Sequence, residues 1–126
     1  YTKLCRSHGG GLSLVNSDPL ISNATISGNT AINSGGGIHI ASNASLFLIN
    51  SIIWDNGSAG EIAGFGESTV TYSDVQVEGD AWFGGGNINA DPQFVDTQNG
   101  NYSLQEGSPC IDAGTEIGRA SCRERV

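Results

Sequence analysis

Apolar and polar residues follow one another along this chain in a phrase that occurs twice. The two copies are Gly9–Ser34 and Gly35–Gly60. Their opening glycines and their first apolar pairs match at an offset of 26 residues, and from Asn23 and Asn50 onward the offset is 27. A period of this length is typical of repeat proteins, in which each copy stacks on the next.

Each copy contains three short runs that suit β-strands. In the second copy they are Ile38–Ile40, Ser45–Ile49 and Ser51–Trp54, which are rich in Ile, Leu, Phe and Trp. Asn, Ser, Gly and Asp separate the runs, and Asn and Gly tolerate the left-handed backbone of a sharp corner. No segment has good helix formers at helical spacing, which argues against a leucine-rich repeat. The pattern therefore predicts an all-β chain.

Stacked copies explain why the whole phrase recurs. The first apolar pair of each copy has a period of two, so one strand face points inward. Each strand would then pair in parallel with its equivalent about 4.8 Å away. Because equivalent residues lie over one another, we expect side-chain amide ladders. Two pairs are candidates, Asn23/Asn50 and Asn29/Asn56.

A third, degenerate copy follows the second. Residues 69–76 supply its strands, with Val70 and Tyr72 expected on one face and Val75 on the next strand. Residues 60–67 and 80–86 are looser loops. The second loop carries Trp82 and Phe83, which either cap the core or stack on the apolar faces of sugars.

Two stretches resemble a known family. Residues 23–31 (NATISGNTA) with residues 35–38 (GGGI) are similar to the phrase of right-handed parallel β-helices, the pectate-lyase-like fold, in bacterial secreted and surface proteins. Residues 87–115 resemble the closing segment that follows such helices. Its matching positions are Asp91-Pro92, Phe94, Asp96, Tyr102, Leu104, Ser108-Pro109 and Asp112-Ala113-Gly114.

The resemblance implies a right-handed single-stranded parallel β-helix of about three to four coils in residues 1–86. The closing segment, residues 87–115, is expected to act as a lid on the apolar cross-section. The residues that would cover it are Phe94, Val95, Tyr102, Leu104, Cys110 and Ile111. In the family, chain that leads to an anchoring or sorting module usually follows this segment.

Residues 116–126 differ from the rest of the chain. They contain three Arg in eleven residues and resemble a translated sequencing adapter, so we expect a non-native tail and exclude it from the fold. Residues 1–8 are expected to be the remnant of a preceding coil. The chain has no Met and begins at Tyr1, so we expect truncation at both ends and marginal stability for residues 1–115 alone.

The charge is strongly acidic. Residues 1–115 contain eleven Asp or Glu but only Lys3 and Arg6 as basic residues. Nucleic-acid binding is excluded because phosphates need cationic partners. Anionic polysaccharides and anionic membranes are disfavoured for the same reason. No apolar run is long enough to cross a membrane.

Candidate chemistry is sparse, and we assign no catalytic, cofactor-binding or metal-binding residue. Loose candidates for paired carboxylates are Asp55, Asp74 and Asp80. Asp91, Asp96 and Asp112 suit either calcium or hydrogen bonds at turns, and their spacing favours turns. His8 and His39 are read as surface residues, and Cys5 as an apolar inward residue, with a disulfide as the alternative.

Two functions remain open. The first is a structural or adhesive role, or glycan binding, in a secreted or cell-surface bacterial β-helix, without catalysis in this part of the chain. The second is part of a polysaccharide lyase or glycoside hydrolase whose active site lies in other coils, since fold alone does not confer chemistry. An ice-binding face would need a Thr ladder, but Thr25 and Thr30 match Ile52 and Gly57 in the next copy.

Overall fold

The chain folds into small β-sheets that are mostly parallel. The computed structural model describes residues 5–57 and 60–114, with side chains from Gly9 onward. Over this range the only helical element is a single 3-10 turn, η1 (Thr97–Asn99). No helix among the described residues is long and apolar enough to span a membrane. The all-β class expected from the sequence is confirmed.

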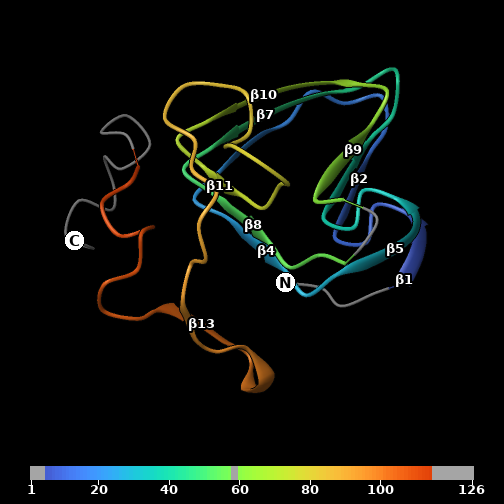
Figure 1. Ribbon diagram of the computed structural model, residues 1–126. Helices are drawn as coiled ribbons and strands as arrows, with labels where there is room; N and C mark the ends of the chain where they lie inside the picture. Colours follow the sequence, from blue (N-terminus) through green and yellow to red (C-terminus); the bar gives the residue numbers. More distant parts are fainter. Residues whose placement is uncertain (1–4, 58–59, 115–126) are drawn as a thin grey trace.

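Three parallel sheets contain one strand each from three successive stretches, which we call levels 1, 2 and 3. The strands of level 1 are β2 (Leu12–Leu14), β3 (Leu20–Ser22) and β4 (Thr25–Ser27). Those of level 2 are β6 (Ile38–Ile40), β7 (Ser45–Ile49) and β8 (Ile52–Trp54). Those of level 3 are β9 (Ile62–Gly64), β10 (Glu67–Thr71) and β11 (Asp74–Val75). The three sheets enclose a common interior (Figure 1).

The register of the strands follows the repeat. Leu12 pairs with Ile38, and Ile38 pairs in turn with Ile62. At the end of β2, Leu14 still pairs with Ile40 at an offset of 26 residues. Two residues later, the backbone N–H of Asn16 bonds to Asn43, at an offset of 27. The extra residue of the second copy therefore enters at the corner after β6, earlier than the sequence comparison placed it.

Four further strands complete the described fold. β1 (Cys5–His8) pairs in parallel with β5 (Thr30–Ser34). Near the other end, β12 (Phe94–Asp96) and β13 (Asn101–Leu104) form an antiparallel hairpin around η1. One isolated parallel bridge joins Asp74 to Ile88, so a fourth, very short level begins after level 3.

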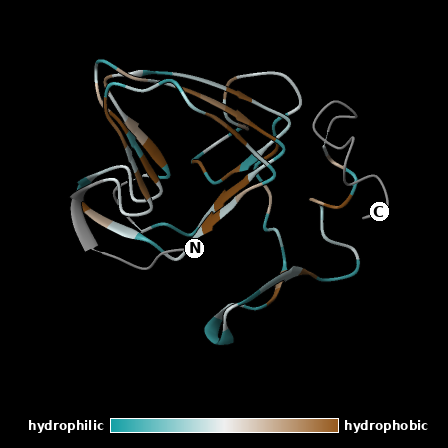
Figure 2. Ribbon diagram, turned by 180° about the vertical axis from the view of Figure 1, so that it is seen from behind, coloured by the Kyte–Doolittle hydropathy of each residue, from teal (hydrophilic) through white to brown (hydrophobic). Residues whose placement is uncertain are grey.

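The apolar core lies inside the three sheets. Residues at equivalent positions form columns, such as Ile26, Ile53 and Val75, whose members are all buried. In Figure 2 the hydrophobic segments lie in the stacked strands, whereas the tip of the β12–β13 hairpin is hydrophilic. Burying such columns supplies most of the stabilisation, at about 25 cal/mol for each Å² of apolar surface removed from water.

One corner of every level has a left-handed backbone. Asn23, Asn50, Tyr72 and Gly86 have φ values of 54°, 52°, 49° and 73°. Tyr72 was expected to share a face with Val70, but β10 ends at Thr71, so Tyr72 turns the corner and its side chain is 42% exposed. The expectation for Tyr72 was wrong because level 3 follows level 2 at a spacing five residues shorter than that between levels 1 and 2. The equivalence of Tyr72 and Asn50 was therefore not evident from the sequence.

A buried amide ladder is confirmed at the second corner. Asn56 Oδ1 accepts hydrogen bonds from the backbone N–H and from Nδ2 of Asn29, at 3.1 and 3.2 Å. In the next level a carboxylate takes the same role, since Glu61 accepts from the backbone N–H of Asn56 at 3.0 Å. Burial raises the pKa of the Glu61 carboxyl. The ladder between Asn23 and Asn50 stays a prediction.

The far end of the core is not covered by the residues expected to form a lid. Val77 and Trp82 pack against the core there, while Phe83 is 96% exposed. None of the six lid residues belongs to the described core, and Val95 and Ile111 are exposed. The hairpin and the chain after it lie beside the sheet of β4, β8 and β11 (Figure 1).

Candidate functional site

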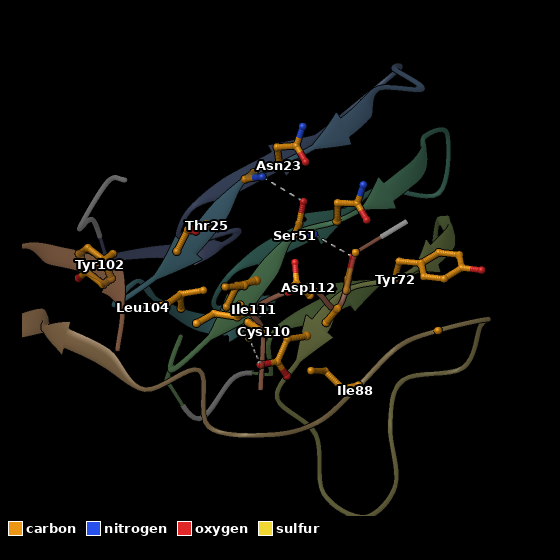
Figure 3. A pocket seen from close by; sticks show the side chains of 18 of the residues that line it. Asn23, Thr25, Ser51, Tyr72, Ile88, Tyr102, Leu104, Cys110, Ile111 and Asp112 are labelled. Atoms are coloured by element: carbon orange, nitrogen blue, oxygen red, sulfur yellow. Dashed lines mark hydrogen bonds between the residues drawn. The ribbon is translucent and has the colours of Figure 1, made fainter. Parts of the chain in front are cut away.

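A cleft separates the sheet of β4, β8 and β11 from the C-terminal segment. Its volume is about 430 Å³. The period of two in these strands sends one row of side chains into the core and the alternate row into the cleft. The row that faces the cleft is Thr25, Ile52, Asp74 and Ile88. The other wall is Tyr102, Ser103, Leu104 and residues 110–114 (Figure 3).

A ladder of hydroxyl groups fixes the sheet side of the cleft. Ser51 Oγ accepts the backbone N–H of Ala24 at 3.2 Å, and Ser73 Oγ accepts the backbone N–H of Ser51 at 3.2 Å. Asn87 Oδ1 then accepts the backbone N–H of Ser73 at 3.0 Å. Both serines also donate to the carbonyl two residues earlier, at the end of the preceding strand. The wall is therefore held by bonds both within and between levels.

Tyr72 presents its ring at the rim of the cleft. A Cβ atom on Gly86 would lie 2.4 Å from Cδ1 of Tyr72, so the ring packs directly over the backbone of the next corner. Only glycine leaves room for this contact, and its φ of 73° suits glycine as well. The ring is thus supported on one side, while the side chain is 42% exposed at the edge of the cleft.

Asp74 joins the two walls. Its Oδ1 accepts the backbone N–H of Ala90 at 3.1 Å, and its Oδ2 accepts the Cys110 thiol at 3.0 Å. Burial raises the pKa of the Asp74 carboxyl. Burial, together with the hydrogen bond to Asp74, raises the pKa of Cys110 to about 12. The thiol therefore stays protonated at neutral pH and is a poor nucleophile.

The carboxylates singled out from the sequence do not gather at one place. Asp74 lines the cleft, but Asp55 and Asp80 do not. Asp55 turns a corner with a φ of 60°, and its backbone N–H donates to Gln76 at 2.8 Å. Asp80 is exposed. In the described part of the chain these three carboxyl groups thus form no common acid–base site.

The expected turn roles are observed for two of the three acids that had suggested calcium. Asp91 Oδ1 accepts the backbone N–H of Gln93 at 2.8 Å, and Asp96 Oδ2 accepts from Asn99 at 2.7 Å. Asp112 lines the cleft. Among residues whose side chains are described, no three His, Cys, Asp or Glu side chains are placed to hold a metal ion.

The remaining candidates lie elsewhere. His39, on β6, is half-buried between two buried isoleucines, rather than fully solvated as expected. The side chains of Cys5 and His8 and all of Cys122 lie outside the described residues. The pairing of Thr25 with Ile52 agrees with the expectation that no Thr ladder forms there.

Sequence reasoning missed the cleft itself. Tyr72 could have been found by matching the corner glycine and asparagine positions across levels, because all four corners share one backbone conformation. The contact between Asp74 and Cys110 had no such signal, since it joins residues 36 positions apart in segments that are not repeats of each other.

The fold and the cleft define a class of protein in general terms: an all-β protein of stacked parallel strands with a polar cleft on its flank. No family model, no curated protein and no solved structure matches this chain.

The chemistry of the cleft favours neutral, polar ligands. None of the described residues that line it is Lys, Arg or His, while Asp74 and Asp112 both contribute carboxyl groups. An anionic ligand would meet these acids without a cationic partner. Hydroxyl, amide and aromatic groups suit hydrogen bonding and stacking.

Proposed function

We propose that this chain is part of a right-handed parallel β-helix protein of the pectate-lyase-like type, secreted or displayed at a bacterial surface, and that the cleft binds a neutral glycan. The parallel register of three successive levels supports the helix. The resemblance of residues 23–31, 35–38 and 87–115 to such proteins supports it as well. The handedness, the compartment and the bacterial origin come from that resemblance.

One observation carries the glycan part of the proposal. The Tyr72 ring is held against Gly86 at the rim of a cleft that no described basic residue enters. Sugar rings have apolar faces that stack on such a side chain, and their hydroxyls pair with polar groups such as Thr25 and Ser103, which line the same cleft. Anionic polysaccharides fit less well because of the acidic walls.

The alternative function, a polysaccharide lyase or glycoside hydrolase, is less well supported by this cleft. A hydrolase needs one carboxyl group to protonate the leaving group and another to act as nucleophile or base. Both oxygens of Asp74 already accept hydrogen bonds from the protein, from Ala90 and Cys110. We therefore place no catalysis in this part of the chain.

The test compares binding of neutral and anionic oligosaccharides by calorimetry, with Tyr72→Asn as the main variant. Asparagine occupies the equivalent corner at Asn50 with nearly the same φ, so the substitution keeps the backbone and removes only the ring. We expect about tenfold weaker binding of the neutral oligosaccharide, which corresponds to about 1.4 kcal/mol of lost stacking.

Phe83→Ala is the matched control, because Phe83 is the more exposed aromatic residue and does not line the cleft. Equal losses in the two variants, or tighter binding of a polyuronate than of the neutral glycan, would refute the proposed site. Glycan cleavage that Asp74→Asn abolishes would favour the enzyme instead.

A further inference from the structure

The level 1 strands form an open edge at one end of the stack. In the described part of the fold, β2, β3 and β4 each stand last in their sheet, with a strand neighbour on one side only. A groove of about 440 Å³ runs along this edge. Its apolar lining includes Leu12, Leu14, Ile21 and Ile26. Open edges of parallel strands bind further strands through their unpaired backbone groups.

Equivalent residues are more exposed in level 1 than in level 2. Ile38 and Leu48 are 0% and 1% exposed, whereas their level 1 partners Leu12 and Ile21 are only half-buried. The two levels have the same strand register, so this difference arises because level 2 has a neighbour on both sides. The groove therefore has the shape of a missing layer of the same core.

A buried oxygen marks the same end. Asn29 is 1% exposed, and its Oδ1 atom has no hydrogen-bond partner in the described structure. Asn29 also lines the groove. One level on, Asn56 Oδ1 accepts the backbone N–H of Asn29 at 3.1 Å. The repeat thus calls for a backbone N–H donor over Asn29, because a buried acceptor without a partner is rare and destabilising. By the register of β1 and β5, that position belongs to the residue before Cys5, which lies outside the described residues.

The chain enters the stack from this side. β1 pairs in parallel with β5, beginning with Cys5 opposite Thr30, the residue after Asn29. β1 therefore already occupies, over β5, the layer that would lie over β2, β3 and β4.

We propose that the groove holds one further level of the same repeat, which runs parallel to β2, β3 and β4 and is continuous with β1. This inference rests on the β-helix architecture proposed above and is independent of glycan binding. A second copy of the chain fits less well. Its far end is covered by Val77 and Trp82, and two open edges related by a twofold axis would run antiparallel.

The test adds the missing level to the full chain. A copy of residues 35–52, the level 2 phrase, is fused before Tyr1, so that it leads into β1. The control fusion carries the same 18 residues in scrambled order. We expect the copied level to raise the melting midpoint by about 5 °C or more over the control. It should also slow amide hydrogen exchange in β2, β3 and β4 at least tenfold.

If the copied fusion does not fold, residues 9–25 are fused instead. Failure of both fusions to exceed the scrambled control in melting midpoint overturns the proposal. An unextended chain that forms a dimer with β2, β3 and β4 protected from exchange would also overturn it, because the occupant would be a second copy. Glycan titration of the same samples reports separately on the proposed binding function.

Discussion

The stacked levels and the C-terminal segment are held in place in different ways. In levels 1 to 3 every strand has a parallel partner, and side chains at the corners bond to the backbone of the neighbouring level. Residues 90–114 instead contact the stack at single points, such as Ala90 and Cys110 on Asp74. Repetition produces a core, whereas the attached segment produces a cleft. The proposed binding cleft therefore lies where the repetition stops.

The two regions should differ most in how much free energy of unfolding is lost when an apolar side chain is truncated. Ile53 is fully buried in the middle of its column, between Ile26 and Val75. Ile53→Ala should lower the free energy of unfolding by about 2–5 kcal/mol, because it leaves a cavity that the flanking levels cannot close. Urea denaturation followed by circular dichroism measures this loss.

Leu104→Ala is the matched control, since Leu104 is a half-buried residue of the C-terminal hairpin that lines the cleft. It should cost about 1 kcal/mol or less, as expected for a partly exposed site. Similar losses for the two variants would mean that the segment belongs to the core after all.

Substitutions at the polar corners should have the next largest effect on the free energy of unfolding. Asn56 is fully buried and bonds to Asn29, Glu61 and the carbonyl of Ile26. Asn56→Ala should cost about 2–3 kcal/mol, because several buried partners lose their bonds together. Asn43 also bonds across levels, to Asn16, but this pair is exposed. Asn43→Ala should cost less than about 1 kcal/mol by the same urea measurement, and a reversed order would contradict the role of burial.

The same contrast explains which parts of the structure the sequence could predict. The pairing of Leu12 with Ile38 and the bonds between Asn29 and Asn56 follow from two copies of nearly equal length. The corner position of Tyr72 was not predicted because the third level is shorter and has tyrosine where levels 1 and 2 have asparagine. The position of the C-terminal segment could not be predicted because it depends on single contacts, such as that of Cys110 with Asp74, between segments that are not repeats of each other.

The smallest predicted effect is a dependence of stability on pH, through two buried acids of the stack, of which one contacts the C-terminal segment. Burial raises the pKa of Glu61 in the stack and of Asp74 at the cleft, so the folded chain binds these protons more tightly than the unfolded chain does. For such groups the neutral form stabilises the fold. The contribution is complete below the unfolded pKa and is lost as the pH rises through the folded pKa. The urea midpoint should therefore rise as the pH falls from 7 toward 5.

Single substitutions separate the two acids. Glu61→Gln keeps an acceptor for the backbone N–H of Asn56 and removes the titration, so it should flatten much of this pH dependence. Asp74→Asn should leave global unfolding nearly unchanged and instead alter proteolysis of residues 101–114, because Asp74 holds that segment through Cys110. If Asp74→Asn flattened the global profile as much as Glu61→Gln did, the segment would unfold together with the stack. The distinction between a repeated core and an attached wall would then fail.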